Sequence, residues 1–124
     1  MAVHRPEEIH GAFTKAFNAG DLDALMALYE SGASVAPAPG QVVTGTAAIR
    51  DVLAGFLALK GQMVITTSRV VAAEDVALLH GSWTLTGTDP DGKAIEMDGR
   101  NTEVARRQAD GTWLFAIDNP FSDA

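Results

Sequence analysis

The sequence predicts an α+β fold, with helices in the first half of the chain and strands in the second. Two observations support this prediction. Up to residue 57, apolar residues recur at the three- and four-residue spacing of amphipathic helices. From residue 62 onward, runs rich in β-branched residues are separated by short turns that contain Gly, Asp and Pro. Helices followed by strands, rather than alternating with them, are typical of α+β folds.

Two helices are predicted before residue 30. Pro6 suits the first turn of the first helix, and Gly20 suits the left-handed position that ends it. Asp21 is then placed to cap a second, shorter helix. The apolar face of the first helix consists of Ile9, Ala12, Phe13, Ala16 and Phe17, and that of the second consists of Leu22, Leu25, Met26 and Tyr29.

The segment from residue 31 to residue 45 is rich in Gly, Pro and Ala and predicts extended structure at a sheet edge. Residues 33–37 are expected to form a short edge strand, where a proline is tolerated. Residues 41–44 are expected to pair with it. A third helix then begins at residue 46, and its apolar face consists of Ile49, Val52, Leu53, Phe56 and Leu57.

Four strands are predicted in the second half, at residues 62–72, 76–86, 94–107 and 112–118. The turns between them are short, so the strands are expected to form an antiparallel meander. The third of these strands is long enough to bend near Gly99. No internal repeat or linker interrupts the sequence, which predicts a single domain over residues 1–124.

Alternation along these strands predicts which side chains face the helices. The more apolar set of the second strand consists of Ala77, Leu79, Gly81, Trp83 and Leu85. In the third strand Gly99, Asn101, Glu103 and Ala105 share a side, and in the last strand Leu114, Ala116 and Asp118 do. If these sets face one cavity, then Trp83, Asn101, Glu103 and Asp118 converge there. The sequence does not determine strand register, and a slip of one residue would reverse every face.

Composition excludes several kinds of site. The chain of 124 residues has 9 Lys and Arg against 16 Asp and Glu, a net charge of −7, and it contains no Cys. Thiolate metal sites and cysteine nucleophiles are therefore excluded, and neither nucleic acid nor an anionic membrane is an expected partner. His4, His10 and His80 are too scattered for metal-ligand spacing. No metal cofactor is therefore expected. No nucleotide cofactor is expected either, because the sequence lacks a glycine-rich phosphate loop.

The chain shows neither a secretory signal nor a transmembrane segment, so a cytoplasmic location is expected.

Four stretches of the chain resemble the nuclear transport factor 2-like superfamily, and most closely its SnoaL-like and ketosteroid-isomerase-like branches. They lie at residues 17–29, 43–49, 81–83 and 111–120. The resemblance implies a strongly curved antiparallel sheet packed around three N-terminal helices, forming a cone with an internal apolar pocket. It also implies a homodimer that associates through the outer face of the sheet, which would place His80 at an interface.

Steroid isomerisation is not expected, because the residues that the resemblance requires for it differ here. Phe13 stands where those enzymes have a tyrosine, and Pro37 stands where they have an aspartate base. Asn101 stands near the position of their acid on the third strand, although an amide can still donate a hydrogen bond. The resemblance to epoxide hydrolases of this fold is looser, since Asn101 replaces one of their two acids. The SnoaL-like cyclases are more similar, because their late acid matches Asp118.

The resemblance and the strand pattern together predict a small enzyme that binds an apolar molecule and transfers a proton beside a carbonyl. The reaction would be an isomerisation, a cyclisation or a dehydration. Asp118 is the expected acid or base and Asn101 the expected group that polarises the carbonyl. The expected substrate-binding residues are Trp83, Glu103, Tyr29, Phe13 and Phe56.

Each of these residues also has a structural interpretation. Asp118 could bond nearby backbone amides, Asn101 could be satisfied by its neighbours, and Glu103 could pair with a base, since a buried acid is costly without a partner. Trp83 and the other aromatic residues could belong to the core. A non-catalytic module that binds a ligand or only dimerises is therefore the alternative function, and a partner-binding subunit is a third.

Overall fold

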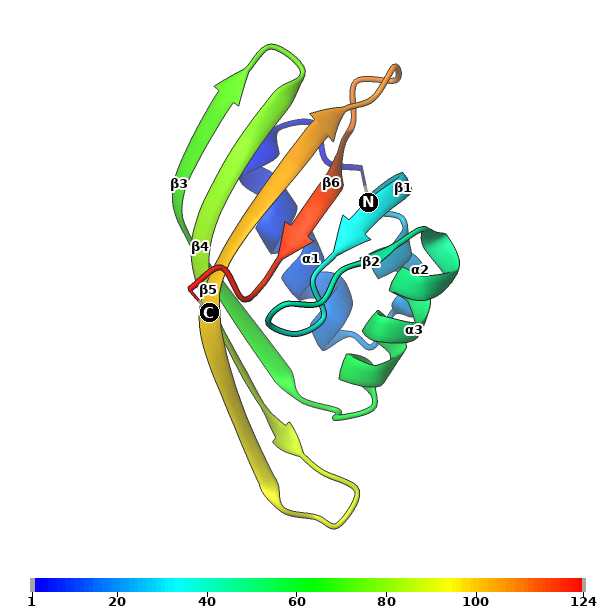
Figure 1. Cartoon of the computed structure of the whole chain (residues 1–124), viewed down its shortest axis with the longest axis vertical. Coiled ribbons are helices and arrows are strands. Elements are labelled where there is room, and N and C mark those ends of the chain that lie inside the picture. The colour runs from blue at the N-terminus through cyan, green and yellow to red at the C-terminus, as the bar shows by residue number, and fades with distance from the viewer. Residues whose placement is uncertain (1, 124) are drawn as a thin grey trace.

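A six-stranded curved sheet with helices on one side makes up the computed structural model, which describes residues 2–123 (Figure 1). The short helix η1 (Pro6–Glu8) precedes α1 (Ile9–Asn18), α2 (Leu22–Met26) and α3 (Thr46–Leu57). The strands are β1 (Tyr29–Val35), β2 (Val43–Thr44), β3 (Gln62–Ala73), β4 (Val76–Thr88), β5 (Ala94–Arg107) and β6 (Trp113–Asn119). Their order across the sheet is β2-β1-β6-β5-β4-β3. The α+β class predicted from the sequence is confirmed.

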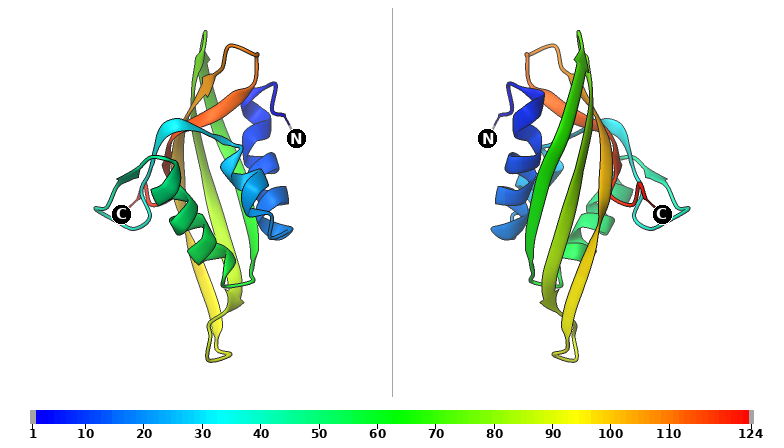
Figure 2. Two further views of the ribbon diagram at one scale, coloured as in Figure 1. Left: turned by 90° about the vertical axis from the view of Figure 1, so that its right-hand side faces the viewer. Right: turned by 90° about the vertical axis from the view of Figure 1, so that its left-hand side faces the viewer.

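The helices lie against the concave face of the sheet, and the opposite face is uncovered (Figure 2). The core fills the space between them. Phe13 and Phe17 of α1 and Ile49 and Leu53 of α3 are buried there, together with Leu79 of β4. The hairpin of β4 and β5 extends beyond the helices, so the distal part of this hairpin has no layer to pack against (Figure 1).

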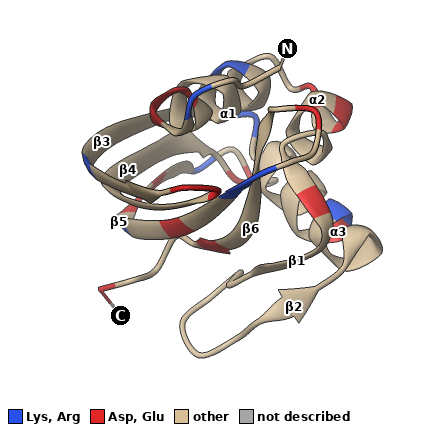
Figure 3. Ribbon diagram, turned by 90° about the horizontal axis from the view of Figure 1, so that it is seen from above, with Lys and Arg blue, Asp and Glu red and all other residues tan. Residues whose placement is uncertain are grey.

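Charged residues of both signs are interspersed over the surface (Figure 3). Two ion pairs lie near one end of the sheet, where Arg106 contacts Glu30 and Arg107 contacts Asp75. Exposed pairs of this kind contribute little to stability, because water and salt screen them. Within residues 2–123 no helix is both long enough and apolar enough to span a membrane.

The boundaries of the later elements agree closely with the sequence prediction, but the first strand does not. This strand was expected at residues 33–37 and instead begins at Tyr29. Tyr29 was expected on the apolar face of the second helix, which ends at Met26. The backbone turns immediately afterwards, where the Leu28 amide bonds the Leu25 carbonyl. The Leu28 carbonyl then accepts from the amide of Phe115, so β6 draws this segment into the sheet.

The sheet is mixed rather than wholly antiparallel. β1 pairs with β6 in parallel, whereas the four strands from β3 to β6 form the expected antiparallel meander. A parallel pair requires a long connection between its strands, and here α3 and the strands β2 to β5 supply it. The prediction of an antiparallel sheet was therefore wrong at this one junction.

The predicted inner faces of β4 and β5 are confirmed. Gly81 pairs with Asn101 and Leu79 pairs with Glu103, and the inward set of β4 is buried throughout. The prediction for β6 needs a correction. Ala105 pairs with Phe115 and Val104 pairs with Ile117, so Ala116 is an unpaired bulge residue. Because a bulge shifts the alternation by one residue, Phe115 and Asp118 both face the helices, and Leu114 pairs with exposed Arg106 on the other face.

Candidate functional site

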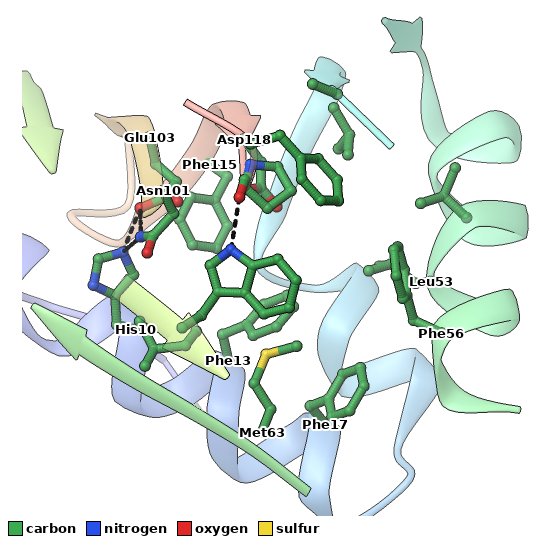
Figure 4. A pocket seen from close by; sticks show the side chains of 17 residues that line it. His10, Phe13, Phe17, Leu53, Phe56, Met63, Asn101, Glu103, Phe115 and Asp118 are labelled. Atoms are coloured by element: carbon green, nitrogen blue, oxygen red, sulfur yellow. Dashed lines mark hydrogen bonds and ion pairs between the residues drawn. The ribbon is translucent and has the colours of Figure 1, made fainter. Parts of the chain in front are cut away.

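A cavity of about 60 Å³ lies between the inner face of the sheet and helices α1 and α3 (Figure 4). Such a volume has room for about two water molecules, at the ~30 Å³ that each occupies in liquid water. Six of the seven residues predicted for the site line it, namely Phe13, Phe56, Trp83, Asn101, Glu103 and Asp118. The remaining one, Tyr29, does not line the cavity but donates a hydrogen bond to Asp118. The rest of the lining is largely aromatic and aliphatic.

Asp118 reaches the cavity from β6, directly opposite Glu103 of β5. Residues opposite each other on one face of an antiparallel pair have Cβ atoms about 4.5–5.5 Å apart, so two carboxyl groups share this part of the site. Burial and, to a smaller extent, the charge of Glu103 raise the pKa of Asp118, whereas the Tyr29 hydrogen bond and the charge of His10 lower it; the net result is a rise from 3.8 to about 7. Asp118 can therefore both hold and release a proton near neutral pH.

Tyr29 fixes the Asp118 carboxyl. Its hydroxyl donates to Asp118 Oδ2 over 2.5 Å. Burial raises the pKa of Tyr29 well above its ordinary value of 10.0, and the negative charge of Asp118 raises it further. Tyr29 consequently keeps its proton and remains a donor across the physiological pH range. Its ring packs against Phe115 at a centroid distance of 5.2 Å, which holds it in place.

Glu103 lies in a buried polar cluster that the sequence did not reveal. Its Oε1 atom accepts hydrogen bonds from His10 Nε2 and from Asn101 Nδ2, the latter at 2.9 Å. The other ring nitrogen of His10 lies 2.7 Å from the Thr67 hydroxyl. His10 was predicted only as one of three scattered histidines. The missed signal is its helical spacing, because His10 precedes Phe13 by three residues and Phe17 by seven, and all three therefore share a face.

Asn101 is oriented by that cluster. Its amide nitrogen donates to Glu103, which leaves the amide oxygen on the other side of the group. The side chain is 3% exposed, and within residues 2–123 no donor lies within hydrogen-bond distance of Oδ1. Gly81 lies opposite on β4, where an added Cβ would stand 3.2 Å from the Asn101 amide. The absence of a side chain at Gly81 therefore provides space for this amide.

Trp83 presents an apolar surface rather than a free donor. Its indole N–H donates to the backbone carbonyl of Pro120 over 2.6 Å. The indole also contacts Phe121 edge to face, with the ring centroids 5.8 Å apart. Gly99 permits this arrangement, since an added Cβ there would stand only 3.0 Å from the indole nitrogen. The Trp83 ring thus connects the sheet to the C-terminal segment along one side of the cavity.

The other walls are apolar. Phe13 lies between Phe17 and Phe115, stacked on the first at 6.1 Å and edge to face with the second at 6.3 Å. Phe56 of α3 lines the opposite side and is only partly buried. Over the described residues 2–123, no three His, Asp or Glu side chains are grouped in a way that could hold a metal ion. A buried carboxyl in an apolar chamber is suited to proton transfer.

Comparison of the sequence with models of protein families identifies the family of this chain. The SnoaL-like domain family matches residues 10–115. This match covers most of the chain, so the chain belongs to the SnoaL-like domain family. A search of curated proteins found no match.

Solved structures with the same fold carry a range of names. A ketosteroid isomerase-like protein from Erwinia carotovora atroseptica SCRI1043 has a TM-score of 0.79 at 22% identity, with 91% of this chain and 89% of that chain covered. A candidate dehydratase of the nuclear transport factor 2-like (NTF2-like) family from Streptomyces avermitilis has a TM-score of 0.76 at 18% identity, with 91% and 90% covered. An NTF2-like protein with a cystatin-like fold from Novosphingobium aromaticivorans has 0.74 at 17%, with 90% and 75% covered. At these identities the likeness shows the fold alone.

Proposed function

We propose that this chain binds a small, mostly apolar molecule in the cavity and that Asp118 transfers a proton at a carbon beside the ligand's carbonyl group. The observation that carries the proposal is the position of the Asp118 carboxyl, which lines a largely apolar cavity and accepts a hydrogen bond from the Tyr29 hydroxyl. The fold is compatible with this reaction, because solved structures that share it include a ketosteroid isomerase-like protein and a candidate dehydratase. The curved sheet and the helices would then act as a cone that encloses the ligand.

The proton transfer follows from ordinary acid–base chemistry. The Asp118 carboxylate takes a proton from the carbon next to the carbonyl, and the electron pair of that C–H bond moves toward the carbonyl oxygen. The protonated carboxyl then returns the proton to another carbon in an isomerisation or to a leaving hydroxyl group in a dehydration. In a cyclisation the carbanion attacks a second carbonyl carbon of the ligand, and the proton goes to the oxygen of that second carbonyl. A group whose pKa is about 7 is suited to both steps. The aromatic walls formed by Phe13, Phe56 and Trp83 would exclude water from the intermediate.

Exchange of ligand protons for deuterium tests this proposal without knowledge of the natural substrate. Butan-2-one, cyclopentanone and 3-hydroxybutan-2-one would be incubated with the protein in D₂O, and the loss of the protons beside the carbonyl would be followed by NMR. Exchange should exceed the background rate for at least one ketone. Asp118→Asn should reduce it about 10²–10⁴-fold. Asp98→Asn, which changes an exposed carboxyl on the outer face of β5, is the matched control and should leave it unchanged.

Two outcomes would contradict the proposal. Exchange at the wild-type rate in Asp118→Asn would show that another group is the base. Saturable binding of a ketone with no exchange above background would support the non-catalytic binding module instead.

The outer face of the sheet supports a second proposal, that two copies of the chain form a homodimer through it. Four apolar residues form a continuous row across four strands, because Leu78 pairs with both Val71 and Val104, and Val104 pairs with Ile117. Three of them, Val71, Leu78 and Ile117, are exposed by 46%, 38% and 49%. Contiguous exposed apolar residues mark interaction surfaces more often than isolated ones do. A second copy would cover this row by a two-fold, self-complementary contact.

A further inference from the structure

The amide oxygen of Asn101 is a buried hydrogen-bond acceptor that has no partner among residues 2–123. The side chain is 3% exposed, and in the described part of the chain, residues 2–123, nothing donates to Oδ1. A buried acceptor without a partner is destabilising, because it has lost its hydrogen bonds to water, so such atoms are rare and need an explanation. Here the explanation must account for the fact that Asn101 lines the cavity.

The orientation of the amide is determined by its neighbours. Glu103 Oε1 can only accept when the carboxylate is ionised, so the Asn101 group facing it must be the nitrogen, which donates over 2.9 Å. A reversed amide would place two acceptors against each other. Since His10 also donates to the same Glu103 oxygen, the cluster keeps the Asn101 oxygen directed away from Glu103.

A second functional group of the site, the Asp118 carboxyl, lines the same cavity as the Asn101 side chain. Asp118 pairs with Glu103, and Asn101 precedes Glu103 by two residues on β5, so Asn101 and Asp118 are diagonal neighbours on the same face. Diagonal neighbours are about 7–8 Å apart, which leaves room for one small polar group to contact both side chains. A hydroxyl is suited to this position, because it can donate to Asn101 and accept from a protonated Asp118. A carbonyl can only accept, so it could not satisfy Asn101 Oδ1.

We infer that the ligand of this cavity carries a hydroxyl or N–H group that donates a hydrogen bond to Asn101 Oδ1. This inference rests on the proposed function and narrows the substrate class from simple apolar carbonyl compounds to compounds that also contain a donor, such as hydroxyketones. It assigns Asn101 an accepting role toward the ligand, in place of the donating role expected from the sequence. The cavity volume of about 60 Å³ restricts the buried part of the ligand to a few heavy atoms.

A pair of probes with matched shapes tests the inference. 3-Hydroxybutan-2-one and 3-methylbutan-2-one differ only in the replacement of a hydroxyl by a methyl group. Each would be titrated into the ¹⁵N-labelled protein, and the dissociation constant would be read from the side-chain amide signal of Asn101 and the indole signal of Trp83. An apolar pocket without an unpaired acceptor should prefer the methyl compound, because burial of a methyl group is favourable. We expect the hydroxyl compound to bind at least about fivefold more tightly, because only it satisfies Asn101 Oδ1.

Two variants distinguish the contribution of the Asn101 amide to probe binding from that of the rest of the pocket. Asn101→Leu keeps a similar volume but has no acceptor, so the preference should invert in favour of the methyl compound. Phe56→Leu alters the apolar wall on α3, so it should weaken both probes and leave their ratio unchanged. The wild-type comparison stands even if Asn101→Leu does not fold.

Each result has a distinct meaning. Equal binding, or a preference of the wild type for the methyl compound, would overturn the inference about Asn101. It would leave the proposed proton transfer intact, since deuterium exchange at Asp118 tests that separately. Failure of both probes to bind up to their solubility limits would overturn the inference as well, because it would show that the cavity does not admit a molecule of this class.

Discussion

Asp118 and Glu103 are two carboxyl groups on one face of the sheet, and their surroundings give them different tasks. Glu103 accepts hydrogen bonds from His10 and Asn101. Asp118 accepts from Tyr29, and burial together with the charge of Glu103 raises its pKa to about 7. When two neighbouring acids are held in unlike environments, one is suited to remain charged and the other to exchange a proton. We therefore place the proton-transfer role on Asp118 and a structural role on Glu103.

The Tyr29 hydroxyl should determine how readily Asp118 loses its proton. Its hydrogen bond favours the charged carboxylate and so lowers the pKa of Asp118. Tyr29→Phe should therefore raise that pKa above 7, by about one unit if the bond contributes ~1.5 kcal/mol. Carbon-detected NMR titration of the Asp118 carboxyl would measure the change. A pKa that falls or stays constant would show that Tyr29 does not act as a donor to the carboxylate.

The raised pKa of Asp118 also predicts how stability depends on pH. Between the unfolded value of 3.8 and the folded value of about 7, the folded state binds more protons than the unfolded state. The contribution of this group is therefore fully favourable below about pH 4, and it is lost as the pH rises through 7. Asp118→Asn should remove this loss. The variant should be more stable than the wild type above pH 7, by up to about 4 kcal/mol, and similar to it at pH 4.

Urea unfolding of both proteins at pH 4, 5.5, 7 and 8.5 would measure that difference. Comparison of the two proteins cancels the titration of groups that they share. A constant difference across the series would contradict the prediction, because it would mean that Asp118 titrates alike in both states.

Among the elements, β4, β5 and β6 build the site, and close contacts between them fix its walls. Trp83 of β4 lies over Gly99 of β5 and donates to the backbone of Pro120, directly after β6. Gly99→Ala would place a methyl group 3.0 Å from both the indole nitrogen and the Pro120 oxygen. We expect this variant to lose about 1–3 kcal/mol of unfolding free energy and to shift the Trp83 indole N–H signal.

The matched control for Gly99→Ala is Gly11→Ala. Gly11 lies within α1, is exposed, and would have no atom within 4 Å of an added Cβ. Alanine is the better helix former, so this variant should gain about 0.5–1 kcal/mol. Thermal or urea unfolding would compare the two. Equal effects at both positions would show that the close contact at Gly99 does not constrain the strands.

Sequence periodicity was sufficient for the elements that are regular and insufficient where tertiary contacts intervene. The bounds of β5 and the inward faces of β4 and β5 were predicted correctly. Inward-facing and outward-facing side chains alternate along both strands, from Val76 to Arg107, and only the turn between the strands interrupts this alternation. The start of β1 was missed, because residues 29–32 carry no strand pattern of their own and are drawn into the sheet by Phe115. Helical spacing therefore did not predict that Tyr29 would lie on β1, where its hydroxyl contacts Asp118.

The prediction that Asp118 faces the cavity agrees with the structure for a reason that the sequence did not contain. Simple alternation grouped Asp118 with Leu114, whereas the bulge at Ala116 puts Phe115 and Asp118 on the same side. A bulge leaves no clear pattern in a single sequence, because it depends on the pairing of two strands. Pairing of Glu103 with a base was expected, but His10 was not identified as that base, since the contact between His10 and Glu103 spans 93 positions along the chain.

At the scale of the whole molecule, the uncovered face of the sheet predicts the oligomeric state of the protein in solution. Leu78 is at the centre of the apolar row, paired with Val71 on one side and Val104 on the other. We expect the wild type to sediment at twice the mass of one chain. Leu78→Asp should yield a monomer, because a two-fold contact would bring two buried charges together without partners.

Thr84→Asp is the control for that experiment. Thr84 lies on the same strand and the same face but outside the row, and it is also exposed. This variant should remain a dimer. A wild type that is already monomeric at high concentration would contradict the proposed homodimer and would leave the cavity chemistry unaffected.

The parallel pairing of β1 with β6 also has a consequence for the order in which the molecule is assembled. During synthesis, the segment Tyr29–Val35 leaves the ribosome long before its neighbour Trp113–Asn119 has been made. The hairpins of β3, β4 and β5 can form from nearby sequence, whereas β1 must wait for almost the entire chain, and such distant pairings form slowly. Tyr29 and Asp118 lie on these two strands. We therefore expect the proton-transfer site to be among the last parts of the protein to take shape, and a nascent or truncated chain without β6 to have no such site.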